Sequence, residues 1–319
     1  MFPNLRRFHS SVRSFRDVDA HIGFIGIGNM GSRMALNLLK GRKKERKLLV
    51  FDKKNSTDAY SKLIGAGAIS AGDVSEVVKN CRIIFSMLPA SQNVRDLYMG
   101  QILPELTEKS VLVDCSTIDP VTVRYLQTES EKLGHLMIDA PVSGGVKGAE
   151  AGTLTFMVGT SLSESDFLGK ELNSLFEPMG KAVYCGGPGV GQSVKICNNL
   201  ILGAQMLGVA EGYKLAKRLG VDLGKFNSVV NSSTGQCWST SKYNPVPGLM
   251  ANVPSSNDYQ GGFQTDLMVK DLELALESAK SVNTSLPVTE FTRGEYKSAS
   301  KEGYGSLDFG SCYKWYAEV

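Results

Sequence analysis

A glycine-rich turn near the start of the chain constrains the fold more than any other feature. Its residues are Gly26, Ile27, Gly28, Asn29, Met30 and Gly31. The turn follows the apolar run 21–27 and opens a segment with helical periodicity, 29–40, which is the setting in which Gly-x-Gly-x-x-Gly binds a dinucleotide. There the first glycine permits a tight turn, the second lets the backbone approach a pyrophosphate, and the third allows close helix–strand packing. The sequence therefore predicts a cofactor cradle that includes the glycines, Asn29 and Met30.

A single acid, Asp52, supplies the second half of this prediction. It closes the next apolar run, 47–51, about 20 residues after the glycine turn, where a carboxylate binds the ribose hydroxyls of NAD and repels the 2′-phosphate of NADP. The sequence therefore predicts NAD as the cofactor. Lys53 and Lys54 follow the acid directly and weaken the prediction against NADP. The alternative is a glycine turn with an unrelated surface acid.

Apolar runs and helix-like segments alternate through the first half of the chain. Further strand candidates are 82–87, 111–114, 135–140 and 156–159. The helix-like segments between them include 74–79, 94–97 and 121–133. Such alternation predicts an α/β fold, namely a Rossmann-type doubly wound parallel sheet with helices on both faces.

The pattern changes after an expected loop at 184–189. Beyond it we find no convincing strand, and the sequence predicts long helices over 191–219, 223–231, 264–281 and 286–302. An all-α C-terminal domain is therefore expected to follow the Rossmann-type sheet. The expected division is a presequence over 1–18, a NAD-binding domain over 19–186, and a helical substrate and dimerisation domain over 187–319.

The first 16 residues have a distinctive composition, with four arginines and three serines but no acid. Phe2, Leu5, Phe8 and Val12 can share one face of a helix, with the arginines elsewhere. This profile is typical of a mitochondrial presequence and predicts the mitochondrial matrix. A disordered basic tail is the alternative.

The remaining composition excludes several classes of protein. The chain is 42% hydrophobic and 21% charged with a net charge of +3, and its basic residues are scattered, so neither nucleic acid nor a membrane surface is an expected partner. The longest uncharged stretch is too short to span a membrane. Six cysteines without a CxxC pair predict reduced core thiols, and three histidines argue against a metal site. The expected partners are a small-molecule substrate and further copies of the chain, as a dimer or tetramer.

One lysine, Lys195, lies on or near the first turn of an unusually apolar helix. No formal charge follows from Ile196 to Ala210, so a helix here is expected to be buried nearly all round. The positive end of the helix dipole and the apolar surroundings disfavour the ammonium form, so we expect a lowered pKa that suits general acid–base catalysis. Asn199 lies one turn further on the same face and could hold the group on which Lys195 acts. The alternative is a lysine that extends from a core helix to water.

The ends of two other predicted strands supply candidate cofactor contacts. Cofactors bind at this edge of a parallel sheet. The nicotinamide half of the cofactor is therefore predicted to contact Leu88, Pro89, Asn93 and Thr117. Taken singly, each of these residues fits an ordinary loop equally well.

Two further segments suit a substrate and a cofactor. Ser143, Gly144 and Gly145 follow a strand and combine a hydroxyl with exposed backbone N–H groups, which suits a carboxylate. Phe263 and Lys270 lie at the start of a late helix, from which Lys270 could reach the cofactor. The respective alternatives are a plain glycine turn and a solvated helix charge.

Together these motifs resemble those of the β-hydroxyacid dehydrogenase family, in the family's order and from about residue 21 to the C-terminus. Besides the glycine turn, the matching stretches are Asp139–Gly145, Gly191–Asn199 and Lys270–Leu272. Three more stretches are similar to the branch that acts on 3-hydroxyisobutyrate rather than to the glyoxylate or tartronate semialdehyde reductases: Cys237–Ser239, Tyr243–Gly248 and Asp258–Phe263.

The resemblance implies NAD-dependent oxidation of 3-hydroxyisobutyrate to methylmalonate semialdehyde, a step of valine catabolism. It implies that Lys195 is the general acid/base and that Asn199 helps to hold the substrate. It further implies that the substrate carboxylate binds at Ser143, Gly144 and Gly145. Trp238 is expected to form a wall of the pocket near the substrate's methyl group.

Two other functions remain open. A short-chain semialdehyde reductase of the same family would use NADPH, against which Asp52 argues. A non-catalytic NAD-binding module would keep the glycine turn and Asp52 but could lose Lys195, Asn199 or Ser143. All three of these residues are present.

Overall fold

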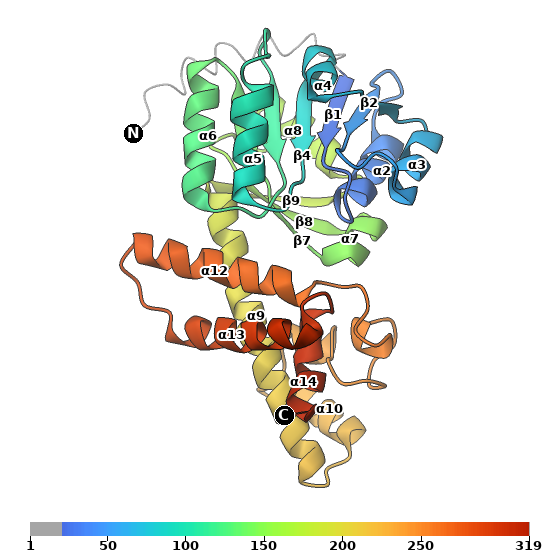
Figure 1. Ribbon diagram of the computed structural model, residues 1–319, viewed down its shortest axis with the longest axis vertical. Helices are drawn as coiled ribbons and strands as arrows, with labels where there is room; N and C mark the ends of the chain where they lie inside the picture. Colours follow the sequence, from blue (N-terminus) through green and yellow to red (C-terminus); the bar gives the residue numbers. More distant parts are fainter. Residues whose placement is uncertain (1–20, 319) are drawn as a thin grey trace. The chain divides into compact units, whose positions relative to one another are not determined.

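The computed structural model describes residues 21–318, so the predicted presequence over 1–18 lies outside the described residues. The chain divides into two compact units between Lys195 and Ile196. The first unit holds the sheet and its helices, and the second is helical (Figure 1). The predicted fold class, a Rossmann-type sheet followed by an all-helical part, is confirmed.

The described residues of the first unit form a nine-stranded sheet in the order β3-β2-β1-β4-β5-β6-β8-β7, with β9 paired to β8. The central strands are parallel, and their bounds are β1 His21–Ile25, β2 Leu48–Phe51, β3 Ile69–Ser70, β4 Cys81–Ser86, β5 Val111–Asp114 and β6 Leu136–Asp139. The remaining strands are β7 Val142–Ser143, β8 Leu154–Gly159 and β9 Gly180–Gly186. From β1 the sheet continues through β2 and β3 on one side and through β4, β5 and β6 on the other. The strand order therefore reverses between β1 and β4, and doubly wound sheets bind nucleotides at such a switch point.

The far end of the sheet departs from the predicted parallel arrangement. Strand β8 runs antiparallel to β6 and to β7, and β9 then pairs parallel to β8. The expected loop at 184–189 is wrong for its first three residues, which end β9. Residues of β9 are exposed or half-buried, and the strand pairs only with β8, so it lacks the apolar run that marks a central strand.

Helices cover both faces of this sheet (Figure 1). Their bounds are α2 Gly31–Gly41, α3 Asp58–Gly65, α4 Val74–Asn80, α5 Ser91–Leu97, α6 Pro120–Lys132, α7 Gly145–Ala151 and α8 Phe167–Phe176. Strand residues alternate between two buried clusters, with Ile83 and Phe85 in one and Ile84 in the other. Successive side chains of a strand point to opposite faces, so a buried cluster on each side means that both faces of the sheet are covered.

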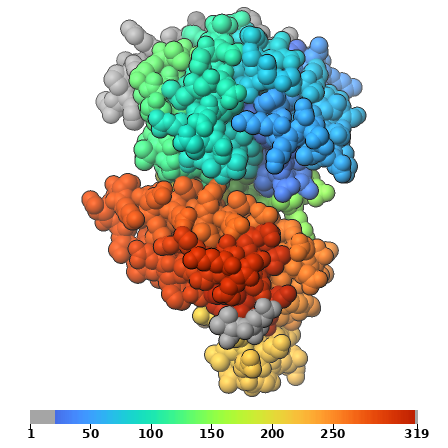
Figure 2. Space-filling model, in the orientation of Figure 1, coloured from blue at the N-terminus to red at the C-terminus, as the bar shows by residue number. Residues whose placement is uncertain are grey.

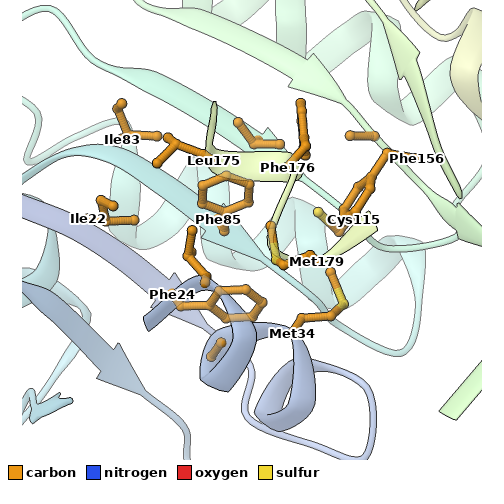
Figure 3. Packing of buried hydrophobic residues seen from close by; sticks show 14 of the residues in the cluster. Ile22, Phe24, Met34, Ile83, Phe85, Cys115, Phe156, Leu175, Phe176 and Met179 are labelled. Carbon is orange, nitrogen blue, oxygen red and sulfur yellow. The ribbon is translucent and has the colours of Figure 1, made fainter. Parts of the chain in front are cut away.

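One of the two clusters is rich in aromatic rings (Figure 3). The rings of Phe24 and Phe85 stack with centroids 6.0 Å apart, and Phe156 and Phe176 lie at 4.7 Å. Phe176 ends α8 and meets Phe85 edge-on. These contacts fix α8 on the sheet although the sequence did not predict that helix.

The second unit contains helices, and its described residues include no strand beyond the single bridge between Gln264 and Asp308. Its main helices are α9 Val190–Arg218, which begins in the first unit, α10 Leu223–Asn231, α11 Trp238–Ser241, α12 Thr265–Ser281, α13 Pro287–Ala299 and α14 Cys312–Glu318. The core gathers Met206, Tyr213, Met268, Tyr296 and Phe309. Short 3₁₀ and π turns connect α11 to α12 and α13 to α14.

Helix α9 is not buried nearly all round, as its lack of charge suggested. The exposed fraction is 53% for Ile201 and 60% for Leu215, and Gly208 between them is also exposed. Even within the uncharged stretch 196–210, α9 thus presents apolar residues such as Ile201 to its surroundings. The end of α9 and the start of α10, gold in Figure 2, protrude from the helical unit.

The structure tests the predictions that the cysteines are reduced core thiols and that no segment spans a membrane. All six cysteines are free, but only Cys81, Cys115 and Cys312 are buried, and Cys197 is exposed, so the prediction of core thiols is wrong for part of the set. In residues 21–318, no helix combines the length and apolar character that a membrane span needs.

A buried carboxylate, Asp308, organises the loops of the helical unit. It accepts hydrogen bonds from the Tyr243 hydroxyl at 2.8 Å, the Phe263 N–H at 2.8 Å and the Gly310 N–H at 2.9 Å. Burial nevertheless raises the pKa of Asp308 to about 7, because loss of solvent outweighs these bonds.

We expect Asp308 to make the helical unit less stable as pH rises from 5 to 8. A raised pKa means that the folded state holds the proton more tightly, so its stabilisation is present below the unfolded pKa near 4 and is lost through about 7. In Asp308→Asn, the free energy of unfolding should depend less steeply on pH, by up to about 1 kcal/mol per pH unit. Both tryptophans, Trp238 and Trp315, lie in this unit, so urea unfolding followed by tryptophan fluorescence measures it.

The matched control is Asp258→Asn, an exposed acid in the same loop region whose left-handed backbone, with φ 47°, tolerates asparagine. It should keep the wild-type slope. If the free energy of unfolding changed with pH equally in the wild type and in Asp308→Asn, the prediction would be contradicted.

Candidate functional site

The glycine turn forms an open cradle between β1 and α2. Gly26 has φ +94°, and a side chain there would overlap the Met87 carbonyl. A side chain at Gly31 would overlap the Gly26 carbonyl. By contrast, Gly28 is exposed, and no protein atom lies within 4 Å of the position a Cβ would take. The turn is therefore closed on the protein side and open at Gly28, which fits a bound pyrophosphate.

The residues between the glycines differ in exposure. Asn29 is exposed, and its carbonyl accepts a hydrogen bond from the Arg33 side chain at 2.7 Å. Met30 precedes α2 as its N-cap and packs partly against the buried cluster. No carboxylate stands in the first turn of α2, so no acidic side chain there opposes an anion.

Asp52 lies beside the same turn. Its Oδ2 accepts the Ile27 N–H at 2.6 Å, and its Oδ1 accepts the Lys54 N–H at 2.7 Å. Each carboxylate oxygen can accept more than one hydrogen bond, so the half-exposed acid keeps capacity for ribose hydroxyls. The predicted acid thus also supports the glycine turn, a role that the sequence did not suggest.

Strands β4, β5 and β6 end in three buried polar residues that are register partners, Ser86, Asp114 and Asp139. Asp114 accepts hydrogen bonds from the hydroxyls of Ser86 and Ser116, each at 2.7 Å. The Ser116 Oγ in turn accepts the Leu88 N–H at 2.8 Å. Burial raises the pKa of Asp114 to about 6 despite these bonds.

This polar cluster brings together the loops that were predicted to contact the nicotinamide. Leu88 and Pro89 follow β4, and Thr117 follows β5 directly after Ser116. Leu88 and Thr117 are half-buried, and Pro89 is exposed. Asn93 is exposed on α5 and does not take part in the cluster. Their contacts with a cofactor remain predictions.

Asp139 joins the sheet to the helix of Lys195. It accepts the Gly189 N–H at 3.0 Å and the Gln192 N–H at 2.9 Å, and so satisfies two backbone donors at the start of α9. The Gln127 amide donates to it at 3.2 Å. Burial raises the pKa of Asp139 to about 6. A side chain at Gly191 would overlap the Met157 carbonyl, so the helix start lies directly on β8.

Lys195 is buried, with an exposed fraction of 7%. Because α9 begins at Val190, Lys195 lies at the start of the second turn, near the first turn as predicted. Asn199 follows one turn later on the same helix and is 2% exposed. Burial of both side chains fits the catalytic reading better than a lysine that extends to water.

Ser143 ends the short strand β7, and two glycines then begin α7. Gly144 and Gly145 have φ +132° and +62°, conformations that favour glycine. Ser143 is half-buried and Gly144 is exposed. The Asn37 amide on α2 donates to the Ala149 carbonyl at 2.7 Å and ties α7 to the helix that follows the glycine turn.

In the helical unit, one buried acid connects two predicted site residues. The Asn199 amide donates to Asp271 Oδ2 at 2.6 Å, and the Lys270 Nζ lies 3.4 Å from Asp271 Oδ1. Asp271 is 2% exposed, so this contact orders Asn199 and Lys270 together. Sequence reasoning missed Asp271, although an acid inside an apolar helix turn was the available signal.

Trp238 and Phe263 are the remaining predicted residues of this unit. Trp238 is 46% exposed and stacks on Tyr243 with centroids 4.6 Å apart. Phe263 packs edge-on against Phe309 at 5.9 Å. The Tyr243 hydroxyl and the Phe263 N–H both donate to Asp308. Through these bonds, Trp238 and Phe263 belong to one ordered loop cluster. Among residues 21–318, no group of three or more His, Cys, Asp or Glu could hold a metal ion.

Two protein families match successive parts of the chain. Residues 21–187 match the NAD binding domain of 6-phosphogluconate dehydrogenase. Residues 189–316 match a domain described as NAD-binding of NADP-dependent 3-hydroxyisobutyrate dehydrogenase.

Curated and solved relatives agree with these matches. The mitochondrial 3-hydroxyisobutyrate dehydrogenase of Mus musculus is 43% identical over 300 residues, which cover 93% of this chain and 87% of the relative. A probable mitochondrial 3-hydroxyisobutyrate dehydrogenase of Dictyostelium discoideum is 43% identical over 98% of this chain and 94% of its own length. A solved structure of Mycobacterium tuberculosis 3-hydroxyisobutyrate dehydrogenase with L-serine has a TM-score of 0.83 and 34% identity, and covers 93% of this chain and 99% of its own.

The open side of the glycine turn leads to a test of the cradle. Gly28→Ala meets no protein atom, so stability should be unchanged. Overpacking against a bound pyrophosphate costs about 1–3 kcal/mol, so NADH affinity should fall roughly tenfold. Fluorescence titration with NADH and thermal unfolding measure the two effects.

The matched control is Gly65→Ala in α3, another exposed glycine with no protein atom within 4 Å of the added Cβ. It should leave NADH affinity unchanged and raise stability only slightly, through the higher helix propensity of alanine. If Gly28→Ala bound NADH as tightly as the wild type does, the pyrophosphate would have to bind elsewhere than at this turn.

Proposed function

Because the chain belongs to the 3-hydroxyisobutyrate dehydrogenase family, we propose that it oxidises 3-hydroxyisobutyrate to methylmalonate semialdehyde with NAD, as a step of valine catabolism. The observation that carries this proposal is the buried Lys195 on a helix that Asp139 holds at the carboxyl edge of the sheet. The glycine cradle belongs to the same unit and the same edge. An amine and a dinucleotide cradle are what alcohol oxidation without a metal requires.

In this proposal the chain's residues bind the substrate and move one proton. When bound, the nicotinamide supplies the hydride acceptor. Lys195 takes the hydroxyl proton as negative charge develops on the oxygen. Asn199, ordered by Asp271, holds the same oxygen. Ser143 and the N–H groups of its glycines bind the substrate carboxylate. The product is an aldehyde with a carboxylate and not a 3-keto acid, so no decarboxylation is expected.

The remaining contacts of the proposed site are with NAD and with the substrate's methyl group. The NAD contacts are Gly26, Gly28, Asn29, Met30, Gly31, Asp52, Leu88, Pro89, Asn93, Thr117, Phe263 and Lys270. Trp238 forms a wall for the substrate's methyl group, and its exposure leaves an aromatic face for this contact.

The proposal extends to assembly and location. Exposed Ile201, Gly208 and Leu215 repeat every seven residues along α9, which is the spacing of a helix–helix seam. We propose that this seam pairs copies of the chain as a dimer or tetramer. The curated relatives described above are named mitochondrial, and with the acid-free N-terminus this supports the mitochondrial matrix.

Replacement of Lys195 tests the proton-transfer step. Lys195→Ala should reduce turnover with NAD and 3-hydroxyisobutyrate by about 10²-fold or more. Lys195→Arg should fail as well, because a guanidinium stays protonated and cannot act as a base. NADH affinity, measured by fluorescence, should be retained in both variants.

Lys217→Arg is the matched control, since Lys217 is exposed near the end of the same helix. It should turn over like the wild type. Near-normal turnover by Lys195→Arg would mean that Lys195 supplies only positive charge.

Cofactor preference is tested at Asp52. The wild type should use NAD better than NADP, because the carboxylate repels the 2′-phosphate. Asp52→Asn keeps an oxygen that can accept the Ile27 N–H and removes the charge, so kcat/KM for NADP should rise relative to NAD. Asp58 is an exposed acid at the start of α3, so Asp58→Asn removes an equal charge and should not change the ratio. A wild type that prefers NADP would favour the semialdehyde reductase, with Lys53 and Lys54 as phosphate contacts.

A further inference from the structure

Gln192 connects the helix of Lys195 to the loop that carries Thr117. Its side chain is fully buried on the first turn of α9. The amide Nε2 donates to the Ser116 carbonyl at 2.7 Å, and Oε1 accepts the Ile118 N–H at 3.1 Å. These two bonds hold the backbone immediately before and immediately after Thr117.

The held loop is itself joined to the neighbouring strand end. Ser116, whose carbonyl binds Gln192, also accepts the Leu88 N–H and donates to Asp114. Displacement of Gln192 would therefore be transmitted to both loops that were predicted to contact the nicotinamide. Buried hydrogen bonds of this kind specify one arrangement, because an unmade bond leaves a desolvated polar group.

The backbone of Gln192 is fixed independently of its side chain. Its N–H binds Asp139, and the neighbouring Gly191 leaves no room for a shift toward β8. Lys195 lies three residues further, one helical turn away on the same side of α9. Lys195 and the Thr117 loop are thus connected by one rigid helix turn and two hydrogen bonds.

We propose that Gln192 is a positioning residue that holds the Thr117 loop at a fixed separation from Lys195. This proposal rests on the proposed function. The hydride and the proton leave the same carbinol group of the substrate, so the groups that receive them need one fixed separation. A misplacement of about 1 Å can reduce a rate about 10²-fold. A helix and a loop that moved independently would lose this alignment.

Gln192→Met tests the proposal, because methionine has a similar length and lacks both hydrogen-bonding groups. Gln192→Asn is the second variant, since it keeps the amide and shortens its reach. Ser193→Ala is the matched control: Ser193 is on the same turn, but its hydroxyl donates only to the Gly189 carbonyl within the helix start. Two readouts are compared, hydrogen exchange of the segment 115–119 by mass spectrometry and turnover per NADH-binding site.

We expect exchange of segment 115–119 to accelerate at least tenfold in Gln192→Met. Turnover per NADH-binding site should fall at least tenfold, with NADH affinity within about threefold, because the pyrophosphate cradle is untouched. The primary isotope effect on kcat with substrate deuterated at the carbinol carbon should increase, as hydride transfer becomes slower than the other steps. Gln192→Asn should show the same changes to a smaller extent, and Ser193→Ala none.

The outcomes separate this proposal from the proposed function. Unchanged exchange, or faster exchange with normal turnover per NADH-binding site, would overturn the positioning role while an active wild type upholds the dehydrogenase. A merely structural role would lower the number of NADH-binding sites and leave turnover per site and the isotope effect unchanged. If the wild type failed to oxidise 3-hydroxyisobutyrate at all, the proposed function would be wrong, and so would the positioning role of Gln192 in catalysis. Faster exchange of segment 115–119 in Gln192→Met would then still show that Gln192 holds this loop.

Discussion

The interaction on which the arrangement of the candidate site depends is the contact of Asp139 with the start of α9. The first turn of α9 could meet the end of the sheet in several registers. Asp139 removes that freedom because its two oxygens accept separate backbone N–H groups, from Gly189 and Gln192. The contact also satisfies donors that every helix leaves unpaired at its N-terminus. This carboxylate and the regular helix that follows help to place the backbone of Lys195.

Burial of polar groups along this sheet edge has an energetic cost that its hydrogen bonds only partly offset. The pKa of Asp114 and that of Asp139 are each raised to about 6, because burial outweighs the hydrogen bonds that favour the charged forms. Apolar residues at these strand ends would avoid the cost. They would also leave the Leu88 loop and the start of α9 without defined partners. The edge exchanges stability for a single defined geometry, as strained or costly features at functional sites commonly do.

The sequence predicts most of this fold where the signal is local. The glycine turn lies between a strand and a helix, and α10 occupies the predicted residues 223–231, because apolar periodicity determines such elements. Strand β9 and helix α8 were missed because their places depend on pairing with β8 and on the contact of Phe176 with Phe85. The roles of Asp139 and Gln192 were missed for the same reason. Their partners lie tens of residues away in sequence, and no local pattern identifies them.

Two of the proposed functional side chains, Lys195 and Asn199, lie on opposite sides of the boundary between the units, yet they share one helix. Their separation is therefore a property of one helical turn, because regular hydrogen bonding fixes the spacing of residues four apart. Each is then ordered by its own unit, the helix start of Lys195 by Asp139 and the amide of Asn199 by Asp271. The spacing of the two side chains along α9 is therefore set by the helix itself, whichever unit supplies the partner that orders each of them.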